Sequence, residues 1–174
     1  MKKTTLVGIV AAAVGFVAIS GCNSDNSTSW DGPLNADGFP QVAGNYSLTT
    51  SDIVYNCSDG SVGQLVGTTF DVAVQESGST LTMTDTEEVL PLNASIVSQA
   101  AATGDIGGDA SFALTKVLPV EVSGETELVP VTYDITGTFT TSGASGDYNF
   151  TAEDPNSGVT CIYTATFSAD LLGS

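Results

Sequence analysis

The chain has 174 residues, among them 20 Asp or Glu and only 3 Lys, and it contains neither histidine nor arginine. Without histidine, Ser-His-Asp and Cys-His nucleophilic sites and imidazole metal centres are excluded. Without arginine there is no bidentate phosphate clamp, and a formal charge of −17 opposes binding to nucleic acid.

Residues 1–21 have the pattern of an export signal, in which Met1-Lys2-Lys3 is followed by an apolar run that is too short for an ordinary membrane span. The segment Ile19-Ser20-Gly21-Cys22 then resembles the lipobox of bacterial lipoproteins. That resemblance implies a mature chain that begins at a lipidated Cys22 and is anchored in the membrane of the bacterial cell envelope. Asn23 at the next position favours the outer over the inner membrane.

Residues 22–41 are rich in Ser, Asn, Asp, Gly and Pro, a composition typical of a flexible tether. We expect Trp30, the only tryptophan, to dock against the domain; the alternative is a position at the membrane interface. Residues 42–170 are expected to form one domain. Removal of the signal leaves Lys116 as the only basic side chain against twenty carboxylates, a formal charge of −19.

From Val42 onward, apolar and polar residues alternate over eight short runs, which predicts β-strands with one buried face. The run from Val159 to Ser168 is the most regular, whereas residues 95–103 are Ala-rich and also consistent with a short helix. The predicted inward faces carry nine rings that would line or fill the interior: Tyr46, Phe70, Phe112, Tyr133, Phe139, Tyr148, Phe150, Tyr163 and Phe167.

Three short connections, at residues 76–79, 104–108 and 141–146, predict turns between antiparallel neighbours. An eight-strand meander exposes two edges unless it closes, so we predict an all-β, antiparallel up-and-down barrel, with a β-sandwich as the alternative. In a closed meander the first and eighth strands are neighbours. Cys57 and Cys161 then lie at the same end, termed end B, where a disulfide is possible and an oxidising envelope favours it.

The connections at end B, roughly residues 51–65, 85–94, 116–129 and 153–158, are mostly long, whereas the tether enters at the opposite end, termed end A. We therefore expect the long connections to face away from the membrane. They carry a predicted acidic rim that would attract a basic partner. Its carboxylates are Asp52, Asp59, Asp85, Glu87, Glu88, Glu121, Glu125, Glu127, Glu153 and Asp154.

Three segments resemble lipocalin-like lipoproteins of bacterial envelopes: Gly44-Asn45-Tyr46-Ser47, the hairpin from Val74 to Leu81, and the final run from Cys161 to Phe167. The resemblance implies a small barrel that binds an apolar ligand among its inward-facing rings, in a group largely without assigned activity. A shorter segment, Tyr55-Asn56-Cys57-Ser58-Asp59-Gly60, is similar to one in periplasmic lysozyme inhibitors and implies instead that a basic protein binds the acidic rim.

Carboxylate pairs remain as candidates for catalysis, but solvated loop charges explain Glu87 with Glu88 and Glu125 with Glu127 better than a glycosidase site does. Asp105, Asp109 and Asp59 offer oxygen ligands for Ca²⁺, yet aspartate-stabilised turns explain them better. We therefore expect no catalytic residue, metal or cofactor. The predicted function is non-catalytic binding of a small apolar ligand in the barrel, or alternatively of a basic protein at the rim.

Overall fold

The computed structural model describes residues 30–173, apart from residues 86, 88, 92–93 and 123–127; the predicted lipidation site Cys22 therefore lies outside the described residues. The regular structure of the described part consists of strands: β1 (Gly44–Thr50), β2 (Ile53–Cys57), β3 (Val62–Leu65), β4 (Thr69–Ser77), β5 (Thr80–Asp85), β6 (Ala94–Ile96), β7 (Ala102–Ile106), β8 (Ser111–Val122), β9 (Val129–Thr140), β10 (Gly143–Glu153) and β11 (Thr160–Leu171). Among these residues, none forms a helix with the length and apolar character that a membrane crossing requires.

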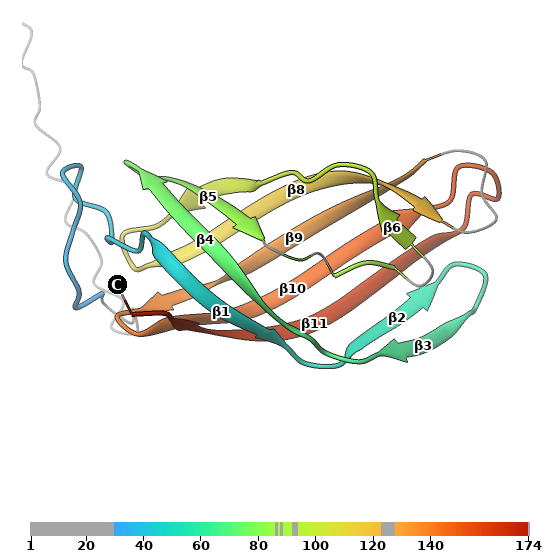
Figure 1. Ribbon diagram of the computed structural model, residues 1–174, viewed down its shortest axis with the longest axis horizontal. Helices are drawn as coiled ribbons and strands as arrows, with labels where there is room; N and C mark the ends of the chain where they lie inside the picture. Colours follow the sequence, from blue (N-terminus) through green and yellow to red (C-terminus); the bar gives the residue numbers. More distant parts are fainter. Residues whose placement is uncertain (1–29, 86, 88, 92–93, 123–127, 174) are drawn as a thin grey trace, which may run out of the picture.

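Eight strands close into an antiparallel barrel in the order β1-β4-β5-β7-β8-β9-β10-β11 (Figure 1). The circuit closes where β11 pairs with β1, with Tyr46 opposite Leu171 and Thr50 opposite Phe167. The predicted barrel is thus confirmed, and the β-sandwich alternative is wrong, because one sheet returns to its own first strand. Closure leaves no free edge along this circuit.

The two ends of the barrel differ in their connections. End A, on the left in Figure 1, carries the tight turns that follow β4, β7 and β9. End B, on the right, carries the connections that follow β2, β8 and β10. The turns predicted at residues 76–79 and 141–146 do lie at end A, but they are shorter than expected. Only residues 78–79 and 141–142 connect the strands, and residues 143–146 belong to β10.

The first long connection differs from its prediction. Residues 51–65, expected to form a loop, contain the β2–β3 hairpin, which extends the sheet at end B. β2 continues along β11 beyond β1, and this register places Cys57 directly opposite Cys161 with their Cα atoms 4.0 Å apart. The predicted disulfide between these cysteines is confirmed.

Asp52 occupies the break between β1 and β2 instead of the rim. Its carboxylate accepts hydrogen bonds from Gln64 Nε2 at 2.6 Å and from the backbone N–H of Gly67 at 3.0 Å. These bonds join the short segment between β1 and β2 to β3 and to the segment between β3 and β4. Asp52 therefore stabilises a bend in the barrel wall.

The fourth barrel strand is also displaced from its prediction. The strand that enters the circuit is β7, at Ala102–Ile106, whereas β6 pairs with β8 outside the circuit. The residues Gly104 and Asp105 are typical of turns, which is why a turn was expected there. In the structure Gly104 lies within β7. Glycine is suited to this position because a Cβ atom there would overlap the carbonyl oxygen of Ala113 on β8.

Aromatic side chains fill much of the barrel interior. All nine of the predicted inward-facing rings are buried. They form two groups of contacting rings: Tyr46, Phe139, Phe112 and Phe167 toward end A, and Phe70, Tyr148, Tyr133, Phe150 and Tyr163 toward end B. Side chains of this size make the middle of the barrel a packed core.

The described part of the predicted tether is attached to end A. Asn35 Nδ2 donates to the carbonyl oxygen of Gly78 at 2.9 Å, and the backbone N–H of Val42 donates to the Glu76 carboxylate at 2.6 Å. Trp30 packs against the core, which confirms the expected docking, and its Nε1 donates to the carbonyl oxygen of Pro33 at 2.9 Å. Residues 30–41 are therefore part of the folded domain.

Candidate functional site

A cavity of about 300 Å³ opens at end B and is here called the end-B cavity. It lies among the β2–β3 turn, the segment after β5, the ends of β8 and β9, and the connection between β10 and β11. Its lining residues are Asp59, Pro91, Val122, Val129, Ala152, Asp154, Ser157, Val159, Cys161 and Tyr163. Its size is at the lower end of the range of roughly 300–1,000 Å³ that is typical of small-molecule sites.

The wall of the end-B cavity is more apolar than polar. Val122, Val129 and Ala152 reach it because each continues the inward phase of its strand at end B. The disulfided Cys161 contributes to the same wall and joins β11 to the hairpin that borders the cavity. An apolar molecule would therefore contact apolar surface on several sides.

Tyr163 contributes an aromatic ring with a hydroxyl group to the cavity. The ring stacks on Phe150 with a centroid separation of 4.3 Å, so the packed core holds it in place. Burial raises the pKa of Tyr163, and the neighbouring Tyr55 raises it further. The hydroxyl group therefore stays protonated at neutral pH and remains able to donate a hydrogen bond.

Two carboxylates border the mouth of the end-B cavity. Asp154 accepts a hydrogen bond from the backbone N–H of Asn156 at 2.8 Å and another from Ser157 Oγ. Asp59 accepts a hydrogen bond from the backbone N–H of Ser61 at 2.9 Å. The backbone and side-chain hydrogen bonds from Ser61 lower the pKa of Asp59. Negative charge at the mouth favours ligands with a neutral or positive polar end.

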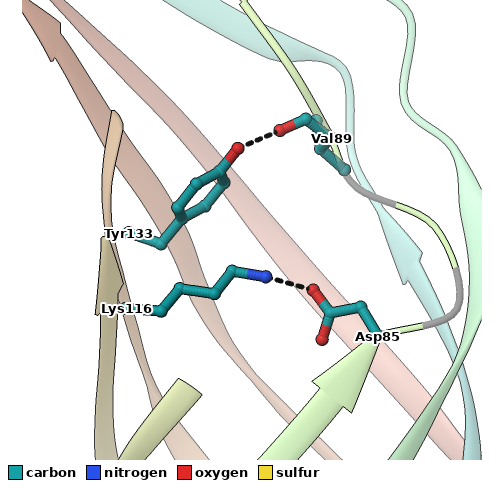
Figure 2. A network of polar contacts seen from close by, with 4 residues as sticks. All are labelled: Asp85, Val89, Lys116 and Tyr133. Atoms are coloured by element: carbon teal, nitrogen blue, oxygen red, sulfur yellow. Dashed lines mark hydrogen bonds and ion pairs between the residues drawn. The ribbon is translucent and has the colours of Figure 1, made fainter. Parts of the chain in front are cut away.

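A buried ion pair occupies the interior beside the aromatic core (Figure 2). Lys116 Nζ lies 2.5 Å from Asp85 Oδ2, and the two side chains are 1% and 0% exposed. The ammonium group also lies 4.7 Å from the centroid of the Tyr133 ring, whose hydroxyl donates to the Val89 carbonyl oxygen at 2.7 Å. These contacts connect β5, β8, β9 and the segment after β5.

This ion pair corrects two expectations. Asp85 does not belong to the acidic rim, because its carboxylate is turned into the barrel to meet Lys116. Lys116 does not lie in an end-B connection, because it faces inward on β8 between Leu114 and Leu118. Two buried charges are tolerated there because each offsets the desolvation of the other.

Among the described residues, the rim is smaller than expected because Asp52 and Asp85 do not belong to it. Glu121 and Glu153 are exposed at the ends of β8 and β10, and Asp59 and Glu87 are exposed in neighbouring connections. Glu88, Glu125 and Glu127 lie outside the described residues. The candidate pair Glu125–Glu127 and one member of the pair Glu87–Glu88 are therefore not described.

Asp109, a candidate Ca²⁺ ligand, stabilises the turn between β7 and β8. Its carboxylate accepts hydrogen bonds from Ser111 Oγ at 2.6 Å and from the Ser111 backbone N–H at 3.1 Å, and these bonds lower the pKa of Asp109. Asp105 lies within β7 instead of in the turn. In the part of the chain that the structure describes, no three Cys, Asp or Glu side chains are grouped so that they could hold a metal ion.

Of the nine rings predicted to bind a ligand, Tyr163 lines the end-B cavity, while the contacts of the other eight place them in the core. Val122, Val129 and Ala152 were not predicted as site residues. Val129 and Ala152 each extend a predicted period-two run by one inward position, whereas Val122 lies within the connection predicted at residues 116–129. The missing information was how far each strand continues before its connection begins.

No protein-family model matches the chain, and no curated protein matches it.

Proposed function

We propose that the protein is a non-catalytic, lipid-anchored binding protein of the bacterial envelope whose end-B cavity binds a small, largely apolar molecule. The observation that supports this proposal is a cavity that is more apolar than polar, lies at one end of an otherwise packed barrel and has one aromatic ring and two carboxylates at defined positions. A hydrophobic wall with few polar groups is the usual composition of a small-molecule site.

The charge at the mouth narrows the class of ligand. Asp59 and Asp154 would repel the carboxylate of a fatty acid, whereas a neutral molecule or an apolar amine would meet no such repulsion. Tyr163 packs between the rings of Phe150 and Tyr55 and adds an aromatic side chain with a hydroxyl group to the wall. The proposed ligand is therefore an apolar ring or branched chain with a neutral or cationic end.

The attachment of residues 30–41 to end A supports an orientation for the proposed anchored protein. A lipid on Cys22 would hold end A toward the membrane and leave the end-B cavity open to the aqueous side. The anchor itself rests on the lipobox resemblance. We expect Cys22→Ser to move the protein from the detergent phase to the aqueous phase in a phase-partitioning assay, and a variant that stays in the detergent phase would contradict lipidation at this residue.

Binding in the cavity is tested with the neutral fluorescent probe N-phenyl-1-naphthylamine. We expect saturable binding to the wild-type protein and a loss of about tenfold or more in affinity for Ala152→Phe, whose added ring would occupy the cavity. The matched control is Val117→Phe, which adds the same kind of ring to the outer face of β8. Equal affinity for both variants, or no saturable binding to the wild type, would contradict the proposal.

A further inference from the structure

The strand β3 ends the sheet at end B. It pairs with β2 on one side, and no other described strand pairs with its second side. In Figure 1 the β2–β3 hairpin continues from β11 past the point where β1 leaves it, so β3 forms the outer margin of the wall. Such a margin presents backbone N–H and C=O groups that are able to pair with another strand.

The register of the hairpin shows which backbone groups face that margin. The N–H of Cys57 donates to the carbonyl oxygen of Ser61 at 2.8 Å. Because hydrogen-bonded and non-hydrogen-bonded pairs alternate in an antiparallel ladder, the backbone groups of Gly63 and Leu65 face β2, and those of Val62 and Gln64 face the free margin. An added strand would therefore pair with Val62 and Gln64.

The margin lacks two of the features that usually prevent strand addition, charged residues and proline. Residues 60–68 read Gly-Ser-Val-Gly-Gln-Leu-Val-Gly-Thr and contain no charged residue and no proline, although the chain has 20 carboxylates. Val62 is 69% exposed and Val66 is 86% exposed. Edge strands are normally protected by charges, proline or bulges, so this one is open to a partner.

The outer face beside this margin is hollowed and apolar. A groove of about 470 Å³ runs over the outer face of β2 and β11, and the exposed side chains of Val54 and Ile162 line it. Asn56 lines the groove and lies opposite Ile162 on one side and opposite Val62 on the other, so the groove extends to β2, the strand beside the margin. Alternate side chains of an added strand would project on this side of the sheet.

The charges beside β3 favour a different partner over a second copy of this chain. Exposed carboxylates flank β3, with Asp59 in the turn before it and Asp52 bonded to Gln64 and Gly67 at its end. In an antiparallel pair of two β3 strands, each Asp52 would approach the other copy's Asp59. Like charges at such positions are destabilising, whereas lysine or arginine there would be attracted.

We propose that β3 is a docking edge for an extended segment of a basic partner protein, in which lysine or arginine residues flank an uncharged, β-forming core. The partner segment adds to the sheet through the backbone groups of Val62 and Gln64. Its outward side chains lie beside those of Val62 and Gln64 and extend the apolar outer face of β2 and β11, and its terminal cations meet Asp52 and Asp59. This proposal does not require a ligand in the end-B cavity, although Asp59 borders both sites.

The test uses the peptide acetyl-Lys-Val-Thr-Val-Thr-Val-Lys-amide and the full-length protein. We expect binding that weakens with salt, and an affinity at least about tenfold lower for Val62→Pro, which removes an edge N–H without removing a bond to β2. The matched control, Val62→Thr, keeps that N–H and should bind as the wild type does. A peptide with Glu in place of both Lys residues should bind at least about tenfold more weakly.

Hydrogen exchange on the wild-type protein provides a readout that does not depend on any variant. Added peptide should slow exchange of the Val62 and Gln64 amides and leave unchanged the amides of β9, which is paired with β8 and β10 on its two sides. The proposal is overturned by equal binding to Val62→Pro and Val62→Thr, by equal affinity of the Lys and Glu peptides, or by unchanged exchange at Val62 and Gln64. A dimer of the protein alone that Val62→Pro dissociates would make a second copy the occupant and would also overturn it.

Discussion

Lys116 and Asp85 form an ion pair in the interior of the barrel, with 2.5 Å between Nζ and Oδ2. The pair joins β8 to β5, and the Tyr133 ring on β9 lies against the ammonium group. Lys116 is the only basic residue in the described part of the chain, so the surface of that part carries negative but no positive side chains. The basic side chain of the described part is thus buried in the barrel interior.

Removing one member of this pair should cost more stability than removing both. Lys116→Met leaves the Asp85 carboxylate buried without its cation, and we expect the free energy of unfolding to fall by about 3–5 kcal/mol. The double variant Lys116→Met with Asp85→Leu should recover most of this loss, because no buried charge remains. Urea denaturation of the wild type, both single variants and the double variant measures the effect, and additive losses would contradict the pairing.

The disulfide should stabilise the fold through the long loop that it closes. Cys57 and Cys161 are 104 residues apart, and the chain-entropy model assigns up to about 4.7 kcal/mol to a loop of this length. We expect the double variant Cys57→Ser with Cys161→Ser to unfold at clearly lower urea concentration. Reductant should lower the midpoint of the wild type toward that of the variant, whereas a wild type that is insensitive to reductant would count against the disulfide.

Tyr46 should make the fold less stable at high pH. Burial, with a further contribution from the charge of Glu76, raises the pKa of Tyr46 to about 12. The unfolded chain ionises this hydroxyl near pH 10, whereas the folded chain keeps it protonated, so the contribution is complete below about pH 10 and is lost as the pH rises toward about 12. Denaturation midpoints measured from pH 9 to pH 12 should fall steeply.

Tyr46→Phe is the control for that titration. The variant loses the hydrogen bond from the tyrosine hydroxyl to the Val42 carbonyl oxygen, so it should be about 1 kcal/mol less stable at neutral pH. Its stability should then fall less between pH 10 and pH 12 than that of the wild type. Parallel curves for the two proteins would show that Tyr46 does not cause the alkaline loss.

Gly104 should not tolerate a side chain, although glycine is usually a poor strand residue. A Cβ atom there would overlap the carbonyl oxygen of Ala113 on the paired strand. We expect Gly104→Ala to lower the free energy of unfolding by roughly 1–3 kcal/mol. Gly108→Ala is the matched control, because a Cβ atom at Gly108 meets no atom within 4 Å. Equal stability of the two variants would contradict the close approach of β7 and β8.

Period-two alternation was sufficient to predict the barrel, because most inward positions carry large apolar residues. In β11, for example, Tyr163, Ala165, Phe167 and Ala169 alternate with exposed polar residues. Alternation failed where an inward position carries a charge: Lys116 has the same phase as Leu114 and Leu118 but was expected in a loop. A sequence pattern cannot show that a second charge, 31 residues away, lies opposite it.

The ligand was expected among the inward-facing rings, in a barrel whose long connections lie at end B. The cavity does lie at end B, yet it is lined by small residues such as Ala152, and most of the large rings lie in the core. Whether rings fill a barrel depends on their mutual packing, such as the stacking of Phe150 on Tyr163. That packing depends on the register between neighbouring strands, whereas period-two alternation indicates only which face each residue occupies.

Methyl NMR of the full-length protein, titrated with N-phenyl-1-naphthylamine, shows directly whether the end-B cavity binds a small apolar molecule. We predict saturable shift changes at the methyl groups of Val122, Val129, Ala152 and Val159, which line the end-B cavity, and none at Val42 or Ala144 toward end A. Shift changes confined to residues outside the cavity, or no saturable change at these four residues, would contradict such binding.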